Sequence, residues 1–392
     1  MDTKLRTLME TKFRDAYGLK DYRIYFAPGR VNLIGEHTDY NGGHVFPCAI
    51  SFGTYALVAD RNDDMIRISS LNFEEDGVIR VPIRDLNIER PDMWTKYPLG
   101  VFRTFKEKGY DIQHGFDILI YGDIPNGAGL SSSASLEVLI GTIIKDSFEL
   151  SDVSMVDVAL FGQYAENNYC GCNCGIMDQF ASAMGRENHA ILLDTNELVY
   201  EYVPLAFENE KIVITNSKVK HNLADGGYNK ARNSAEAALA ELQKEVDIKT
   251  LGDLTEAEFE SYSYAIENDD NYFSAKHAVY ENRRVLKAVE ALRANNFEEL
   301  GKLMYASHMS LRDDYQVSCE EIDLLVDLAH EVEGVWGSRI TGGGFGGCTV
   351  SIVKNEAIDT FIDYVGEEYK RETGIEAEFY VVEAAQGAGR IE

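Results

Sequence analysis

Positive charge is scarce in this sequence of 392 residues, where 37 lysines and arginines stand against 66 aspartates and glutamates, for a net charge of −29. Nucleic acids and anionic membrane surfaces bind proteins through a basic footprint, so we expect neither as the main partner. A small anionic ligand stays compatible with this charge, because a local group of donors and a metal ion can reverse the field inside a cleft.

Long apolar runs are also absent. No stretch approaches the roughly 18 residues that a membrane-spanning helix needs. The first residues, MDTKLRTLME, lack the charged-then-apolar pattern of a signal peptide. We therefore expect a soluble, cytoplasmic protein without a membrane partner.

Cysteine is sparse, with six residues in the whole chain, too few for a disulfide framework. Cys170, Cys172 and Cys174 are clustered, but their C-x-C-x-C spacing is tighter than that of zinc sites, and no histidine pair follows at finger spacing. Reduced, buried small residues are favoured over structural zinc.

The length exceeds what one compact core usually holds, so we expect two domains, at residues 1–200 and 201–392. Strands and helices alternate in both halves, which favours an α+β fold over a doubly wound parallel sheet. A strand at 22–27 is expected to end in a turn at Pro28 and Gly29. Apolar spacing predicts further strands at 54–60, 65–70, 116–121, 190–194, 197–204, 211–216, 348–353 and 377–382, and helices at 5–16, 97–108, 134–145, 156–168, 229–244, 278–294, 297–309, 319–331 and 358–373.

A glycine- and serine-rich segment, GDIPNGAGLSSSAS at 122–135, lies between a predicted strand and a predicted helix. Gly127 and Gly129 let backbone N–H groups approach an anion, and the serines at 131–133 add hydroxyls at the N-terminus of the helix. Phosphate binding is favoured over the alternative, a glycine turn with a serine N-cap. The G-x₄-G-K-[ST] pattern is absent, which excludes an ordinary P-loop NTPase.

The segment APGRVNLIGEHTDYNGG at 27–43 packs polar residues of several kinds beside glycines. Glu36 and Asp39 can accept hydrogen bonds from sugar hydroxyls, and His37 can donate or accept. Arg30 could neutralise a carboxylate or a phosphoryl group. A solvated surface loop is the alternative, and it explains the interleaved apolar side chains poorly.

Two carboxylates are weaker candidates. Asp178, in CGIMDQF at 174–180, sits among apolar residues, where a nearby arginine would keep it ready to accept a proton; a helix N-cap is the alternative. Glu166 lies on a predicted helix, and it is a candidate metal ligand only if the phosphate loop lies close to it.

Glycines crowd the segment GSRITGGGFGGC at 337–348. They allow close backbone approach either to a ligand or to another loop. These two alternatives remain open.

Together these segments resemble the GHMP family of small-molecule kinases, and most closely the galactokinases within it. GRVNLIGEHTD at 29–39 is similar to the galactokinase signature G-R-x-N-L-I-G-E-H-x-D, residues 125–135 to the family's phosphate loop, and residues 342–347 to its third motif. SHMSLRDDY at 307–315 also resembles a galactokinase stretch. The resemblance runs nearly end to end and implies a two-domain GHMP kinase fold, with the active site in the cleft between the domains.

The resemblance also implies roles for individual residues. Arg30 and Asp178 match the catalytic pair. The sugar-binding positions are matched by Glu36, His37, Thr38, Asp39, Asp178 and Tyr228. The ATP-binding positions are matched by Pro125, Asn126, Gly127, Ala128, Gly129, Leu130, Ser131, Ser132 and Ser133, with Trp94 near the adenine. Ser131 and Glu166 match the Mg²⁺ positions, although which of the three serines touches the metal is left open.

The implied activity is transfer of the γ-phosphoryl of ATP to the anomeric hydroxyl of α-D-galactose, by a monomer that uses Mg²⁺. One rival is a non-catalytic sensor of sugar and ATP, but regulators of that kind lack residues of the serine-alanine step that Ser133 and Ala134 keep here. A second rival is a kinase for a related sugar such as N-acetylgalactosamine or arabinose. Whether Asp178 is a true base or an electrostatic guide is also left open.

Overall fold

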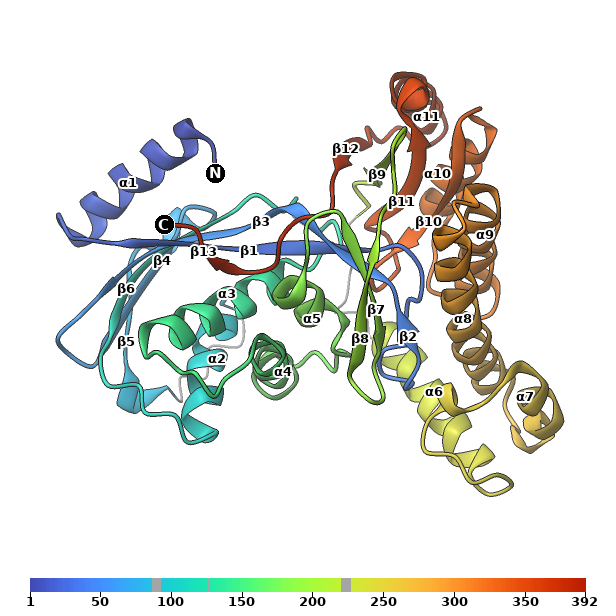
Figure 1. Cartoon of the computed structure of the whole chain (residues 1–392), viewed down its shortest axis with the longest axis horizontal. Helices are drawn as coiled ribbons and strands as arrows, with labels where there is room; N and C mark the ends of the chain where they lie inside the picture. Colours follow the sequence, from blue (N-terminus) through green and yellow to red (C-terminus); the bar gives the residue numbers. More distant parts are fainter. Residues whose placement is uncertain (87–92, 126, 220–226) are drawn as a thin grey trace.

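The computed structural model describes residues 1–86, 93–125, 127–219 and 227–392. Its largest sheet has six strands in the order β13-β1-β3-β6-β4-β5 and is antiparallel except where β4 pairs with β6 (Figure 1). The strands are β1 (Arg23–Asn32), β3 (Pro47–Asp60), β4 (Met65–Ser70), β5 (Ile79–Pro82), β6 (Phe116–Gly122) and β13 (Gly389–Arg390). The last of these brings the C-terminal end of the chain back to the N-terminal sheet.

Helices cover both faces of this sheet (Figure 1). On one face lies α1 (Thr3–Tyr17), whose buried residues Met9 and Phe13 pack in one cluster with Leu57 and Leu119 of the sheet. The other face carries α2 (Lys96–Glu107), α3 (Ser132–Ser147), α4 (Met155–Ala165) and α5 (Met177–Met184).

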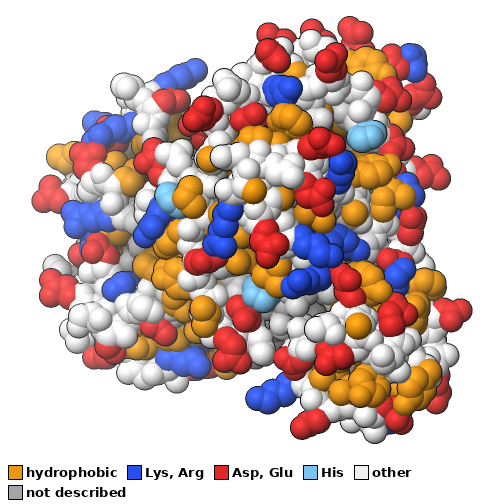
Figure 2. Space-filling view, turned by 45° about the vertical axis from the view of Figure 1, so that its right-hand side comes forward, with side chains coloured by type: hydrophobic (Ala, Val, Ile, Leu, Met, Phe, Trp, Pro, Cys, Tyr) orange, Lys and Arg blue, Asp and Glu red, His pale blue; other side chains and the backbone are white. Residues whose placement is uncertain are grey.

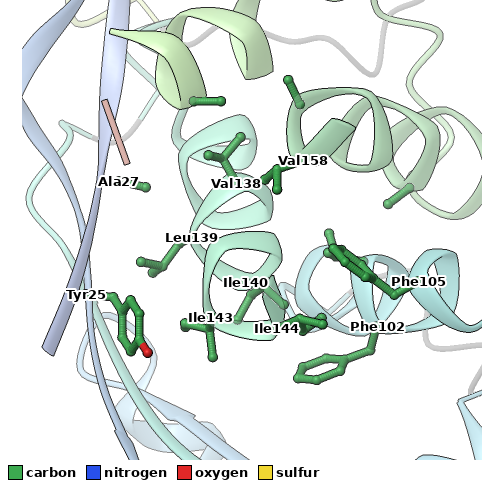
Figure 3. Packing of buried hydrophobic residues seen from close by; sticks show 14 of the residues in the cluster. Tyr25, Ala27, Phe102, Phe105, Val138, Leu139, Ile140, Ile143, Ile144 and Val158 are labelled. Atoms are coloured by element: carbon green, nitrogen blue, oxygen red, sulfur yellow. The ribbon is translucent and has the colours of Figure 1, made fainter. Parts of the chain in front are cut away.

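The central helix α3 is apolar on several sides because it is enclosed. Its Leu139 and Ile143 point toward Tyr25 of β1, while Ile144 points toward Phe102 of α2 (Figure 3). This enclosure fixes the N-terminal end of α3, where the glycine- and serine-rich segment enters the helix.

Two smaller sheets complete the architecture. A three-stranded sheet joins β2 (His44–Val45), β7 (His189–Asp194) and β8 (Val199–Pro204), and a four-stranded antiparallel sheet has the order β10-β11-β9-β12. The strands of this four-stranded sheet are β9 (Glu210–Asn216), β10 (Val335–Thr341), β11 (Cys348–Lys354) and β12 (Glu378–Val382). The C-terminal helices are α6 (Gly227–Leu242), α7 (Glu256–Tyr262), α8 (Asp269–Arg293), α9 (Phe297–Asp313), α10 (Glu320–Glu331) and α11 (Ile358–Thr373).

The two halves share a core. Val31 and Ile34, at the end of β1 and just after it, pack in one cluster with Ile214 of β9, Val285 of α8 and Val350 of β11. The division near residue 200 stays a prediction, while this cluster and β13 tie the first and last parts of the chain together.

The α+β class is confirmed, but the turn predicted at Pro28 and Gly29 is wrong. Strand β1 continues through both residues to Asn32, with a register shift between Pro28 and Arg30. Proline is tolerated in a strand where its missing N–H faces no partner, and the ladder from β1 to β13 involves only Tyr25 and Phe26. The bulge instead redirects β1 beside the phosphate loop.

On the face of the molecule in Figure 2, acidic and basic side chains are interspersed. Within the described ranges, no helix has the length and apolar character needed to cross a membrane.

Candidate active site

A cavity of about 240 Å³ brings together all four segments singled out in the sequence. Its walls come from the end of β1 and the loop after it, residues 124–125 and 127–133, residues between 172 and 178, and the glycines at 342–343. The lining residues include Arg30, Glu36, His37, Asp39, Pro125, Gly127, Ala128, Gly129, Leu130, Ser131, Ser132, Ser133, Glu166, Asp178 and Tyr228. Most of the predicted site residues therefore face one enclosed space.

The phosphate loop lies between β6 and α3, as the sequence predicted. Gly127 and Gly129 have φ values of +70° and +68°, in the left-handed region that favours glycine. A Cβ on Gly29 would lie 2.7 Å from the carbonyl oxygen of Leu130, and one on Gly342 would lie 2.8 Å from that of Gly129. The glycine-rich segment thus packs closely against this loop, while Gly342 and Gly343 also line the cavity, and their approach to a ligand stays a prediction.

Arg30 and Asp178 form a bidentate ion pair in this cavity. Arg30 Nε donates to Oδ1 at 2.7 Å and Nη2 donates to Oδ2 at 2.8 Å, while Nη1 donates to the carbonyl of Gly129 at 2.8 Å. Ser131 Oγ also donates to Asp178 Oδ2, at 2.5 Å. Because Arg30 is buried and Asp178 lies in the first turn of α5, the carboxylate is fixed beside the phosphate loop.

Asp39 lies next to this pair and accepts a hydrogen bond from the backbone N–H of Met177 at 3.2 Å. Burial, together with the nearby charge of Asp178, raises the pKa of Asp39 from 3.8 to about 6. A Cβ on Gly175 would lie only 2.0 Å from Asp39 Oδ2, so the loop needs glycine at that position.

His37 is held in an aromatic group at the other end of the cavity. Its φ of 63° is unusual for a residue other than glycine, and its Nδ1 lies 2.6 Å from the hydroxyl of Tyr40. The rings of Tyr315 and Tyr228 lie 4.8 Å and 5.5 Å from the imidazole. Tyr228, near the start of α6, thus lines the cavity beside His37, and its contact with a sugar stays a prediction.

Glu36 connects the two halves of the chain. Its carboxylate is paired with Arg339 of β10 at 2.5 Å and accepts from Asn32 Nδ2 at 2.8 Å, Thr341 Oγ1 at 3.1 Å and Gly342 N at 2.9 Å. Burial raises the pKa of Glu36, although Arg339 opposes the shift. A sugar hydroxyl that bound Glu36 would join a carboxylate that is already fully hydrogen-bonded.

Three predicted residues lie away from the cavity or outside the described part. Thr38 is buried and donates its hydroxyl to the carbonyls of Gly35 and His44, at 2.8 Å and 2.6 Å. Trp94 stacks on Phe73 with ring centroids 6.0 Å apart and donates to Asp76. Asn126 lies outside the described residues.

Glu166 lies on the cavity wall in a π-helical turn, Glu166–Cys170, that directly follows α4. Burial and the charge of Asp178 raise its pKa, whereas hydrogen bonds from Ser133, Cys174 and Gln179 lower it. Cys172 and Cys174 also line the cavity and are free thiols, half-buried rather than fully buried as expected.

Carboxylate and hydroxyl oxygens are the donors that Mg²⁺ prefers, and such sites combine one or two carboxylates with substrate phosphates and water. Among the described residues no group of three histidine, cysteine or acidic side chains forms a protein-only metal cage. Glu166 with Ser131 or Ser133 therefore fits a magnesium ion that arrives with a nucleotide.

Sequence reasoning missed several residues that shape the site. Tyr40, Gly175, Tyr315 and Arg339 lie in or beside the segments already singled out, but nothing in their local pattern marks them. Glu137 is buried on α3, where burial and the neighbouring Glu166 raise its pKa well above the usual value. The available signal was that Glu137 is the one charged residue in the mostly apolar stretch at 134–144.

Comparisons with known proteins identify the family. The galactokinase galactose-binding signature matches residues 11–60, and the GHMP kinase N-terminal and C-terminal domains match residues 96–186 and 288–371. The galactokinase of Clostridium beijerinckii is 52% identical over 98% of both chains, and that of Bacillus subtilis is 48% identical over 100% of this chain and 99% of the relative. The chain belongs to the galactokinase family. Its members are ATP-dependent sugar kinases of the GHMP group.

Solved structures agree with this membership. A galactokinase of Lactococcus lactis, crystallised with galactose, is 41% identical, has a TM-score of 0.97 and is matched over 99% of this chain and 100% of its own. The mevalonate kinase of Methanococcus jannaschii is 19% identical with a TM-score of 0.66, and it shows the shared fold alone.

Proposed function

We propose that the enzyme transfers the γ-phosphoryl group of ATP to the anomeric hydroxyl of α-D-galactose, giving α-D-galactose 1-phosphate and ADP. The observation that carries this proposal is the contact of Arg30 with both Asp178 and the carbonyl of Gly129. This contact supports the proposal because it holds the Asp178 carboxylate beside Gly129, in a cavity that is also lined by Asp39 and His37.

Asp178 orients the anomeric hydroxyl and accepts its proton as the hydroxyl oxygen bonds to the γ-phosphorus. The bond from the γ-phosphorus to the bridging oxygen breaks, and that oxygen leaves with ADP. Arg30 keeps the Asp178 carboxylate in position and stabilises negative charge on the moving group. Ser131, a residue of the loop itself, donates to Asp178 and so links the loop to the proposed acceptor.

The loop residues 125–133 hold the ATP phosphates through backbone N–H groups and the N-terminus of α3. Magnesium would be held by Glu166 and Ser131, and when bound it neutralises charge on the phosphates. Trp94, on its stack with Phe73, is the proposed neighbour of the adenine.

Asp39, His37 and Tyr228 are the proposed direct contacts to galactose. Glu36 is proposed to contact it as well, while Thr38 shapes the loop from which these side chains project. An unfilled acceptor in a buried sugar site costs roughly 1–3 kcal/mol, which is enough to reject an epimer at one hydroxyl.

We further propose that the enzyme acts as a monomer in the cytoplasm. The site residues named above all come from one chain, and the six cysteines are free, as in a reducing compartment.

A coupled assay of ADP release across galactose, N-acetylgalactosamine, arabinose and glucose tests the proposal. We expect release with galactose to be about 5- to 150-fold faster than with its epimer glucose, the range that about 1–3 kcal/mol gives. If no sugar of the panel leads to ADP release, a non-catalytic sensor is favoured. A preference for N-acetylgalactosamine or arabinose would favour a kinase for a related sugar.

A further inference from the structure

Gln179 directly follows Asp178 in α5 and is fully buried. Its side-chain Nε2 donates to Glu166 Oε2 at 2.6 Å and to Glu137 Oε2 at 2.9 Å. One amide group thus joins two carboxyl groups that belong to different segments, the helix α3 and the π-helical turn after α4. The steps proposed above use neither Gln179 nor Glu137.

The surrounding backbone restricts this amide. Gly162 of α4 packs against it so closely that a Cβ there would lie 3.2 Å from Gln179 Cγ and 3.3 Å from Glu137 Cβ. Glycine at position 162 therefore lets α4 lie close against Gln179 and Glu137, where almost any other side chain would be crowded. The helices α3, α4 and α5 meet here, and the Gln179 side chain is fully buried between them.

Glu166 needs such a partner. Its carboxylate is buried on the cavity wall, and its backbone lies in a π-helical turn, which is uncommon and often marks a functional site. Cys174 Sγ donates to the same oxygen at 3.5 Å, but a thiol is a weak donor. A buried carboxylate needs donors to offset its desolvation cost, and Ser133 also donates to Glu166. At the oxygen that Gln179 and Cys174 share, the amide bond of 2.6 Å is the shorter of the two, so the Gln179 amide holds this oxygen most firmly.

We propose that Gln179 is a positioning residue, whose amide, anchored on Glu137, fixes the Glu166 carboxylate for the divalent cation of the reaction. This inference rests on the proposed metal role of Glu166. Because Asp178 and Gln179 are consecutive, the first turn of α5 then sets both the proton acceptor and the metal ligand. Hydrogen-bond partners of metal ligands are typically worth a factor of about 10–100 in metal affinity.

The test is Q179M, which keeps the length of the side chain and removes the N–H donors. We expect Mn²⁺, followed by electron paramagnetic resonance with a non-hydrolysable ATP analogue present, to bind at least about tenfold more weakly than to the wild type. The Mg²⁺ concentration for half-maximal activity should rise by a similar factor. Calorimetric binding of galactose without metal should stay unchanged, which a general loss of structure would not allow.

A matched control is Q163M on α4. The Gln163 amide donates to the carbonyl of Cys174 at 3.3 Å and has no bond to Glu166, so Q163M should bind Mn²⁺ like the wild type. E137Q keeps an acceptor for the Gln179 amide and should also stay close to wild type, whereas E137M removes the anchor and should weaken Mn²⁺ binding. If Q179M does not fold, the pair E137Q and E137M gives the same comparison.

Two outcomes separate this inference from the metal site itself. Wild-type Mn²⁺ binding in E166Q would overturn the proposed metal role. Weakened binding in E166Q together with wild-type binding in Q179M and E137M would overturn the positioning role and leave the metal site in place.

Discussion

Arg30 and Asp178 are 148 positions apart in the sequence, yet the guanidinium of one binds both oxygens of the other, at 2.7 Å and 2.8 Å. The remaining nitrogen of Arg30 binds the carbonyl of Gly129 in the phosphate loop. One side chain thus holds both the proposed proton acceptor and the proposed phosphate loop. This geometry leads to the first prediction.

Arg30→Ala should lower kcat by about a hundredfold or more and change the KM for ATP much less, because Arg30 acts on the acceptor and the moving phosphoryl. R30K keeps the charge but not the two-pronged contact, and it should recover only part of the loss. Steady-state kinetics with both substrates varied provide the measurement. Loss of ATP binding with unchanged turnover at saturation would contradict the assignment.

Galactose binding should depend on the protonation of Asp39, whose pKa is raised to about 6. As the pH falls from 7 to 5 the carboxylate takes up a proton and loses its acceptor function, so the dissociation constant for galactose should rise. In D178N the midpoint should move to lower pH, because the neighbouring charge that contributes to the shift is gone. Calorimetric titrations between pH 5 and 8 measure both midpoints, and equal midpoints would show that the two carboxylates do not interact.

The same shift has a consequence for stability. A carboxyl whose folded-state pKa lies above its unfolded value stabilises the fold at low pH, and this stabilisation is lost as the pH rises through the folded value. D39N, which is always neutral, should therefore gain stability relative to the wild type between about pH 4 and 6 and keep that gain above it. Urea unfolding at pH 4 and pH 7.5 gives the comparison, and a gain confined to pH 4 would be the wrong sign.

Gly175→Ala should abolish galactose binding and leave nucleotide binding largely intact. Its Cβ would lie 2.0 Å from Asp39 Oδ2, so the carboxylate or the loop must move. Gly122→Ala is the control, since there the nearest atom would be at an ordinary 3.8 Å and the site is also close to the phosphate loop. Galactose affinity of G175A equal to that of G122A would show that the loop can adapt.

Breaking the ion pair of Glu36 and Arg339 should lower the free energy of unfolding strongly, because both side chains are buried. R339M leaves a carboxylate without its counter-ion and should cost about 3 kcal/mol of unfolding free energy at neutral pH. This loss of unfolding free energy should grow with rising pH, because the unpaired, buried Glu36 stays protonated in the folded protein while it ionises in the unfolded chain. The double variant E36M/R339M should recover much of this loss. Denaturant unfolding of R339M, E36M and the double variant measures the coupling, and additive losses would contradict the prediction.

Much of the fold could be predicted because its signals are local. The predicted strand at 65–70 and helix at 358–373 have the same bounds as β4 and α11. The helix α5 was missed, since eight residues give too short a pattern to read. Pro28 and Gly29 were wrongly predicted to form a turn. The local sequence does not reveal that the ladder from β1 to β13 involves only Tyr25 and Phe26, so that a proline fits into β1 beyond them.

The site was predictable as segments and not as a network. The glycines and serines of the loop predict phosphate binding, because they supply exposed backbone N–H groups and hydroxyls. The local sequence pattern made Asp178 only a weak candidate. Its contact with Arg30, which strengthens the case, depends on the packing of α5 against β1. The roles of Gln179 and Arg339 depend on contacts between helices and sheets distant in the sequence, which single-sequence patterns do not contain.

The most direct test of the account is phosphoryl transfer by D178N, followed by ³¹P NMR of galactose 1-phosphate, with calorimetric binding of galactose and of an ATP analogue measured on the same protein. The account predicts that both ligands bind within a few-fold of the wild type while turnover falls by about a factor of 10²–10⁴, the usual contribution of a positioned base. Near-normal turnover with sugar binding intact would contradict it.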